Sequence, residues 1–274
     1  MKKIILASDG TEFSEAAFDF AQQLNELEPI LLTGIFIPQL SYASLWSYTN
    51  ALGGPAVLPL IDQDENEAIQ KNILHFENLC QRNGITYRVH KDFTDFALPE
   101  IRKESRFADL LLLSSERFYH NILGDDEIEY IVETLQKVEC PVLVVPEKFQ
   151  FPAKNVLAYD GGASSVYAIK QFTYLLPQLC NLETTVLTIN KDEDTEMPHE
   201  PELKELLHQH FKHVNFLKLG TASRKSFSDW MQAQKNSLVV GGSFGRSTLS
   251  QMFRKSFLRD VISEHKLPVF IAHK

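Results

Sequence analysis

An internal repeat constrains the fold of this chain of 274 residues more than any other feature of its sequence. Residues 3–18, KIILASDGTEFSEAAF, align with residues 154–169, KNVLAYDGGASSVYAI, so that Asp9 corresponds to Asp160. The ends of the two halves also match, in the segments ADLLLLSS (108–115) and NSLVVGGS (236–243), and CPVLVVP (140–146) and LPVFIAH (267–273). The sequence therefore predicts two domains with one fold.

Each half alternates short apolar runs with longer segments of helical periodicity, which is typical of buried parallel strands joined by helices. We expect helices over 12–27 and 66–83, the second ending before a left-handed Gly84. Strands are expected at about 3–8, 30–36, 85–90, 109–113, 141–145, 155–159, 184–189, 213–218, 237–240 and 268–272. This pattern predicts an α/β fold of two Rossmann-like domains, 1–150 and 151–274, each a five-stranded parallel sheet with helices on both faces.

The segment 38–65 has no counterpart in the second half and contains Tyr42, Trp46 and Tyr48. It is much longer than a typical loop of about 4–6 residues. It could be a lid, a pad between the domains or a surface insertion without a role.

The net charge of −9 argues against nucleic-acid binding, because a phosphate backbone is bound by a basic surface. The charge is uneven: residues 1–150 carry 12 basic against 24 acidic residues, whereas residues 151–274 carry 15 against 12. We expect only the second half to attract an anion.

No apolar run approaches the about 18 residues of a membrane helix, and the first residues do not resemble a signal peptide. We therefore expect a cytoplasmic protein without a membrane partner. Cys80, Cys140 and Cys180 show no CxxC spacing, and we expect reduced, structural thiols.

A glycine-rich stretch, GGSFGRST, follows the expected strand 237–240. Arg246, Arg254, Lys255 and Arg259 lie in or after it, and no acidic residue occurs between Asp229 and Asp260. Small residues allow backbone N–H groups to approach a phosphate, although a plain turn would also be rich in glycine. The corresponding stretch of the first half, 115–129, contains five acidic residues and should repel phosphate.

These residues resemble the nucleotide-binding motif of the universal stress protein family, G-x2-G-x9-G-[ST]. Gly242, Gly245 and Ser256 match it in spacing, and Lys255 stands where the family has glycine. Asp160 matches the family's aspartate after the first strand. The first half keeps Asp9 but has Ser115, Phe118, Ile128 and Glu129 at the motif positions, so the chain resembles a tandem universal stress protein with one degenerate half.

The resemblance implies a stress-response regulator of HUP-type domains that binds ATP or another adenine nucleotide and has at most weak ATPase activity. The implied nucleotide-binding residues, all in the second half, are Asp160, Ile189, Gly242, Ser243, Gly245, Arg246, Lys255 and Ser256. Lys255 could obstruct the phosphates or could contact them through its ammonium group. No catalytic residue and no metal ligand is assigned.

In this family the last strands pair across a homodimer. The resemblance implies that Pro141–Val145 and Pro268–Ala272 pair within one chain here, as an intramolecular pseudo-dimer that could dimerise further. An unknown protein partner is also expected, and an interaction scaffold that binds no nucleotide is the main alternative.

Two enzyme readings remain as remote alternatives. Gly241–Gly245 fits the G-x-S-x-G nucleophile elbow of serine hydrolases around Ser243, with Asp260 and His265 downstream, but only 31 residues follow that serine. The segment Asp160–Ser165 resembles the SGGxDS loop of ATP pyrophosphatases but lacks its aspartate.

His208, His210 and His213 could suggest a metal site, but no Cys or Glu completes one. We read them as a solvated helix end, with His213 at the start of the next strand.

Overall fold

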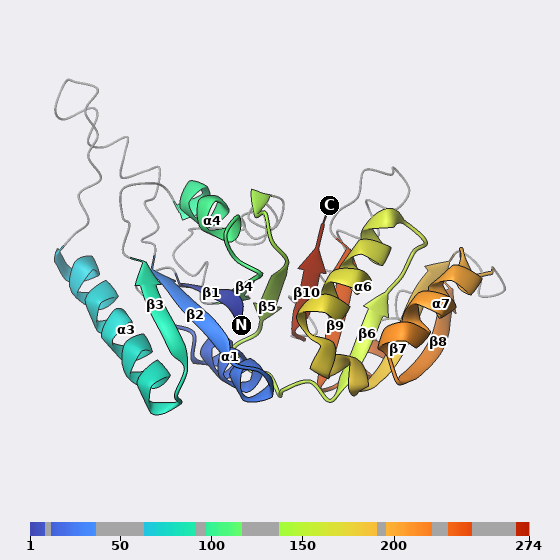
Figure 1. The fold of residues 1–274 in the computed structure, drawn as a ribbon, viewed down its shortest axis with the longest axis horizontal. Helices are drawn as coiled ribbons and strands as arrows, with labels where there is room; N and C mark the ends of the chain where they lie inside the picture. The colour runs from blue at the N-terminus through green and yellow to red at the C-terminus, as the bar shows by residue number, and fades with distance from the viewer. Residues whose placement is uncertain are drawn as a thin grey trace, which may run out of the picture. The chain divides into compact units, whose positions relative to one another are not determined.

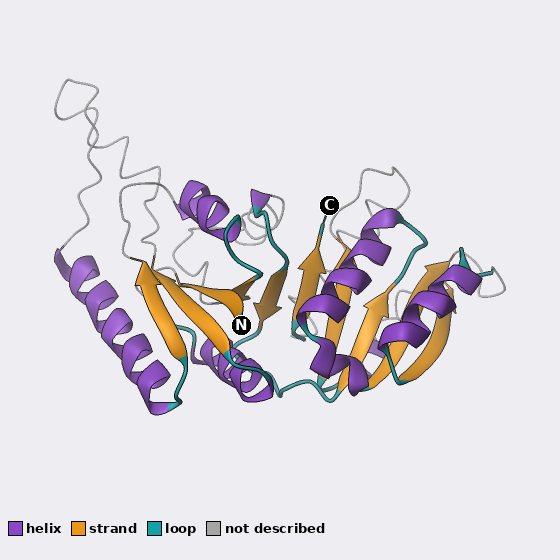
Figure 2. Ribbon diagram, in the orientation of Figure 1, coloured by secondary structure: helices purple, strands orange, loops and turns teal. Residues whose placement is uncertain are grey.

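The structure is a computed structural model that describes residues 1–8, 12–36, 63–90, 97–116, 137–190, 196–220, 230–242 and 267–273. The chain forms two compact units, Met1–Cys140 (unit 1) and Pro141–Lys274 (unit 2). Figure 1 labels their elements, and Figure 2 distinguishes helices from strands.

Unit 1 contains a parallel sheet with the strand order β3-β2-β1-β4. Helix α1 packs on β1, β2 and β4, and α3 packs on β2 and β3. The elements in chain order are β1 (Lys2–Ser8), α1 (Glu15–Leu27), β2 (Ile30–Phe36), α3 (Gln63–Arg82), β3 (Thr86–His90), α4 (Ala97–Ser105) and β4 (Leu110–Ser114).

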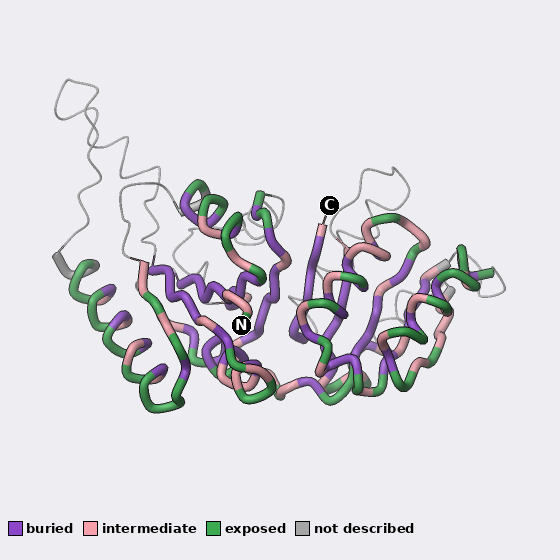
Figure 3. Tube along the Cα trace, viewed as in Figure 1, coloured by how far each residue is buried: buried purple, intermediate pink, exposed green. Residues whose placement is uncertain are grey.

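The core of unit 1 is built around Phe76 of α3, which is fully buried. Its ring lies 6.3 Å from that of Phe18 on α1, 5.7 Å from Phe36 on β2 and 5.9 Å from Tyr87 on β3. Edge-to-face packing of these rings therefore stabilises the packing of α1 and α3 on the sheet. Figure 3 shows β1 buried along most of its length, as expected for a strand inside a parallel sheet.

The strands of unit 2 follow one another in the order β5-β10-β9-β6-β7-β8. All its neighbouring strands are parallel except β5 and β10. The elements in chain order are β5 (Val142–Val145), β6 (Lys154–Ala158), α6 (Ala163–Leu175), the 3-10 helix η1 (Pro177–Asn181), β7 (Glu183–Asn190), α7 (Glu200–His210), β8 (His213–Gly220), β9 (Ser237–Gly242) and β10 (Val269–Ala272).

Strands β5 and β10 pair antiparallel, with Val144 opposite Val269 and Val142 opposite Ile271. The expected pairing of 141–145 with 268–272 is therefore confirmed. By the sequence repeat, β5 belongs to the first half of the chain, whereas the contacts of β5 in the structure assign it to unit 2. The predicted domain boundary at residue 150 and the boundary between the compact units, after Cys140, thus differ in which domain contains this strand.

The core of unit 2 includes Phe172 of α6, whose ring lies 5.5 Å from Phe270 of β10 and is stacked on Phe211 at 6.3 Å. Figure 1 shows α6 and α7 on the same face of this sheet. That arrangement is expected when successive parallel strands are added in one direction by right-handed connections.

All ten strands lie within two residues of their expected bounds, and Gly84 has the expected left-handed conformation at φ 63°. Helix α1 begins at Glu15 rather than at residue 12, because the side chain of Ser14 accepts a hydrogen bond from Ala17 N (3.0 Å) and caps the helix there. Helix α3 includes residues 63–65 of the long segment 38–65, and residues 38–62 lie outside the described part of the chain.

The three cysteines are free thiols and are buried, as expected. Burial is the main cause that raises the pKa of each thiol to about 12, so these groups stay protonated and unreactive at neutral pH. Within the described residues, no helix combines the length and apolarity that crossing a membrane would require.

Candidate functional site

The carboxyl ends of β6, β7 and β9 lie at one edge of the unit 2 sheet, because β6 pairs in parallel with both other strands. Three of the residues expected to bind a nucleotide are found at this edge: Asp160 just after β6, Ile189 near the end of β7 and Gly242 at the end of β9. Open α/β sheets bind ligands at such an edge, where the strand order reverses. Asp160 is exposed, and Ile189 and Gly242 are half-buried.

Asp160 organises the turn between β6 and α6. Its Oδ1 atom accepts a hydrogen bond from Gly162 N (2.9 Å) and lies 2.7 Å from the hydroxyl of Ser165. The Ser165 hydroxyl can also donate to the carbonyl oxygen of Gly162 at 2.8 Å. The carboxylate therefore fixes the backbone that leads into α6, whatever else it contacts.

The same turn is packed against the segment before α7. Gly161 has φ 77°, and a Cβ atom there would lie 2.6 Å from Cβ of Pro198. The buried Tyr159 donates a hydrogen bond from its hydroxyl to the carbonyl oxygen of Pro198 (2.8 Å), and burial raises the pKa of this hydroxyl. These contacts hold the Asp160 turn in place from the side of β7.

Gly242 is in close contact with the first turn of α6. A Cβ atom at position 242 would lie 2.5 Å from both the carbonyl carbon and the oxygen of Ser164, and 2.7 Å from Ser165 N. These are main-chain atoms that cannot move aside cheaply, so only glycine allows this approach. The end of β9 and the beginning of α6 therefore meet directly.

The N-terminus of α6 is suited to an anion. The helix begins after Gly162, which provides no side-chain cap, and its first turn contains no acidic residue. The partial positive charge of a helix N-terminus favours a phosphate, and this end lies at the ligand-binding edge of the sheet.

Unit 1 differs at the equivalent place. The registers of β1 with β4 and of β6 with β9 make Ser114, rather than Ser115, the counterpart of Gly242. Ser114 Oγ accepts a hydrogen bond from Glu116 N (3.3 Å), and Ser115 donates to the carboxylate of Glu116 (2.6 Å). Strand β4 thus ends in Leu113 and Ser114 where β9 ends in two glycines, and the acidic Glu116 follows two residues after its end.

The rest of the expected motif lies outside the described residues. This holds for Ser243, Gly245, Arg246, Lys255 and Ser256 in the second half, and for Asp9, Phe118, Ile128 and Glu129 in the first. It also holds for Asp260 and His265 of the remote hydrolase alternative. Their roles stay predictions.

Sequence reasoning missed three residues of this edge. Ser165 could have been found, because the repeat aligns it with Ser14, the cap of α1. Tyr159 and Pro198 could not, because their hydrogen bond joins residues 39 positions apart and no motif marks either one.

The histidines of α7 do not form a metal site in the described part of the chain. The helix ends at His210, and His213 begins β8, as one reading of the sequence expected. Among the described residues, no group of three or more His, Cys, Asp or Glu side chains could hold a metal ion.

Comparison with known proteins gives a consistent result, although no protein-family model matches the chain. The chain is 26% identical over 210 residues to the universal stress protein Slr1230 from Synechocystis, covering 70% of this chain and 71% of that protein.

Two solved structures share the fold over the whole chain. A universal stress protein from Archaeoglobus fulgidus matches 100% of this chain and 96% of its own, with a TM-score of 0.69 and 16% identity. A functionally unknown protein, PA1789 from Pseudomonas aeruginosa, matches 100% and 92%, with a TM-score of 0.57 and 13% identity. In sequence the chain is thus similar to a universal stress protein, and it shares its fold with the two solved structures.

Proposed function

We propose that unit 2 binds an adenine nucleotide such as ATP and that the protein is a stress-response regulator with little or no catalytic activity. The nucleoside contacts Asp160 and Ile189 at the ends of β6 and β7. The phosphates lie between the N-terminus of α6 and the segment that starts at the end of β9, which contributes Gly242, Ser243, Gly245, Arg246, Lys255 and Ser256.

The observation that carries this proposal is the contact of Gly242 with the main chain of Ser164 and Ser165. It brings Gly242, at the start of the glycine-rich stretch, next to a helix N-terminus that has no acidic residue in its first turn. Backbone N–H groups and a helix N-terminus that converge in this way can bind phosphate.

The charge of the second half supports the same ligand. Arg246, Arg254 and Arg259 follow β9 in a stretch without acidic residues, so they would attract a phosphate chain. Lys255 replaces the family's glycine, and its effect on affinity is a separate question that one substitution can answer.

Unit 1 is expected to bind no nucleotide. Ser14 already caps α1, Glu15 lies in its first turn, and Glu116 follows β4. These groups occupy or repel the positions that a phosphate would need. One nucleotide should therefore bind to each chain.

Calorimetric titration of the full chain with ATP and with AMP tests the proposal. We expect saturable ATP binding with a stoichiometry near one per chain. Two equivalent sites would contradict a nucleotide-free unit 1. Absence of binding by both nucleotides would instead favour an interaction scaffold of the same fold.

A further inference from the structure

A short segment before α7, Met197–His199, lies against the Asp160 turn. We call this segment the α7 strap. The strap and the turn are joined by the hydrogen bond from the Tyr159 hydroxyl to the carbonyl oxygen of Pro198, and by the packing of Pro198 on Gly161. The strap is therefore anchored at the place where the chain leaves β6.

Tyr159 is held both at its main chain and at its hydroxyl group. Its N–H group donates to the carbonyl oxygen of Leu187 on β7 (2.9 Å), and its hydroxyl donates to Pro198 (2.8 Å). Only 4% of the residue is exposed, and a buried hydroxyl without a partner would be costly. Tyr159 therefore connects the end of β6 to β7 and to the α7 strap.

Two residues at this contact have a left-handed backbone conformation, Gly161 at φ 77° and His199 at φ 51°. Glycine adopts this conformation freely, but it is uncommon for histidine and persists where neighbouring contacts hold it. His199 also begins α7, because its carbonyl oxygen accepts a hydrogen bond from Leu203 N (3.0 Å). The hydrogen bond to Pro198, the residue before His199, is one contact that holds this conformation.

Unit 1 has a different contact at the equivalent position. The repeat aligns Tyr159 with Ser8, whose hydroxyl donates to the carbonyl oxygen of Glu12 (2.6 Å). A serine side chain is much shorter than that of tyrosine, and this hydrogen bond stays within the connection from β1 to α1. Ser8 therefore does not join the end of β1 to the following strand and helix as Tyr159 joins β6 to theirs.

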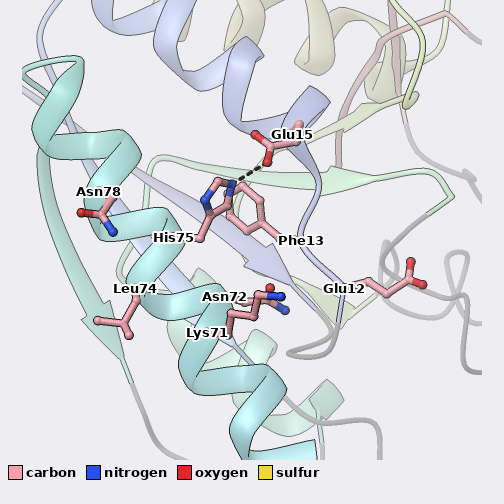
Figure 4. A pocket seen from close by; sticks show the side chains of 8 residues that line it. All are labelled: Glu12, Phe13, Glu15, Lys71, Asn72, Leu74, His75 and Asn78. Carbon is pink, nitrogen blue, oxygen red and sulfur yellow. Dashed lines mark hydrogen bonds and ion pairs between the residues drawn. The ribbon is translucent and has the colours of Figure 1, made fainter.

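The start of α1 is instead joined to α3 by other side chains (Figure 4). The rings of Phe13 and His75 meet edge to face, 5.2 Å apart, and His75 Nε2 lies 2.5 Å from Glu15 Oε1. The repeat aligns Phe13 and Glu15 with Ser164 and Val166, whose side chains can make neither contact. Each unit thus fastens this region in its own way, and the connection to the strap belongs to the unit with the glycine-rich stretch.

We propose that Tyr159 is a positioning residue for the nucleoside part of the ligand, an inference that rests on the proposed nucleotide function of unit 2. By joining β6, β7 and the α7 strap, it holds the Asp160 turn at a fixed distance from Ile189 at the end of β7. It acts through this turn and makes no contact with the ligand. The phosphates, which lie toward Gly242, do not depend on it.

Tyr159→Phe in the full chain tests the proposal, because it keeps the ring and removes only the hydrogen bond to Pro198. Calorimetric titration should show AMP and ATP affinity lowered by the same factor, about two- to tenfold for one hydrogen bond. The factor is common because both ligands carry the same nucleoside. Tyr174→Phe is the matched control, since it removes the same group from an exposed residue near the far end of α6 and should change neither affinity.

Two further measurements approach the same contact. In Gly161→Ala the added methyl group would lie 2.6 Å from Pro198 Cβ, so it should push the strap away and also weaken AMP and ATP by one common factor. Without any ligand, the Gly162 amide, which donates to Asp160 Oδ1, should exchange with solvent faster in Tyr159→Phe than in the wild type.

The outcomes separate this proposal from the nucleotide function. Unchanged affinities in Tyr159→Phe, a larger loss for ATP than for AMP, or an equal loss in Tyr174→Phe would each overturn the positioning role while unit 2 still binds a nucleotide. Unchanged exchange of the Gly162 amide would overturn it whether or not a nucleotide binds. If the wild type binds neither AMP nor ATP, the proposed function fails and the positioning role fails with it.

Discussion

Gly242 at the end of β9 lies against the main chain of Ser164 in α6, at a distance where a Cβ atom would be 2.5 Å from the carbonyl carbon. The two residues are far apart in sequence: Ser164 lies shortly after Asp160, and Gly242 belongs to the glycine-rich stretch 241–248. Their contact joins the strand that precedes the glycine-rich stretch to the helix that follows the Asp160 turn. The nucleotide proposal for unit 2 depends on this junction.

Substitution of Gly242 by alanine should open the junction. The added methyl group meets main-chain atoms, and we expect a loss of about 1–3 kcal/mol in the free energy of unfolding. ATP affinity should fall as well, because α6 must move away from β9. Phe172→Leu is the control, since it weakens the core beneath α6 without touching the junction. If both variants lower ATP affinity equally, the junction has no specific role.

Asp160 should have a structural role and a ligand-binding role that two variants can separate. Asp160→Ala removes the acceptor for Gly162 N and Ser165 Oγ, and should cost about 0.5–2 kcal/mol of unfolding free energy, as for a lost helix cap. Ser165→Ala removes only one of these hydrogen bonds. We expect ATP affinity to fall in Asp160→Ala and to stay near the wild-type value in Ser165→Ala. Equal affinities in these two variants would mean that Asp160 only supports the turn.

The sequence predicted the strands well because most are short runs of β-branched and leucine residues, and central ones such as β1, β4 and β9 are buried along most of their length. The repeat gave a second reading of the matching strands, and the pairing of 141–145 with 268–272 was implied by the resemblance to universal stress proteins. The start of α1 was misplaced by three residues because the capping side chain of Ser14 was overlooked.

The candidate site was predictable only in part. The resemblance implied Asp160, Ile189 and Gly242 as site residues, and their place at one edge could be expected because parallel strands bring their carboxyl ends together. The contacts of Gly242 with Ser164 and of Gly161 with Pro198 join distant parts of the chain. Such contacts depend on how each helix packs on the sheet, and the hydrophobic periodicity of the sequence does not specify this packing.

Lys255 is the residue that departs from the family motif, and we expect Lys255→Gly to raise ATP affinity. Glycine would let the N–H group of Ser256 approach the terminal phosphates, and one added hydrogen bond corresponds to about a two- to tenfold gain. Three arginines already supply positive charge in this stretch, so the lost ammonium should matter less. Titration of both proteins with ATP at one salt concentration is the measurement. A fall in affinity would instead identify Lys255 as a ligand of the nucleotide.

Strand β5 should stabilise the C-terminal fragment of the chain. Fragment 141–274 keeps the β5–β10 pair, whereas fragment 151–274 leaves the edge of β10 without this partner. Each apolar side chain that loses its burial costs about 1.5–3 kcal/mol. We expect fragment 151–274 to melt at a lower temperature and to self-associate, and fragment 1–150, in which β5 lacks β10, to self-associate too. Equal melting temperatures of the two C-terminal fragments would show that β5 adds nothing to unit 2.

The stability of unit 1 should depend on pH through Glu139. Its carboxylate accepts hydrogen bonds from Arg106 Nε (2.7 Å) and Arg106 Nη2 (2.8 Å), and from Arg102 Nε (3.2 Å). The hydrogen bonds from Arg106 are the main cause that lowers its pKa from 4.5 to about 2. These contacts join α4 and the residue that follows it to Glu139, just before the end of unit 1.

A carboxyl group with a lowered pKa in the folded state binds protons more weakly there than in the unfolded chain. Its contribution to stability is therefore complete above about pH 4.5 and is lost as the pH falls toward about 2. Glu139→Gln removes this contribution. The wild type should therefore be more stable than the variant above about pH 4.5, and this extra stability should disappear as the pH falls from about 4.5 to about 2. Urea unfolding of both proteins across this range measures the difference, which should also shrink with added salt because the arginines are exposed. A difference that stays constant from neutral pH to the acid end of the window would show that the arginine pairs do not stabilise unit 1 through the charge of Glu139.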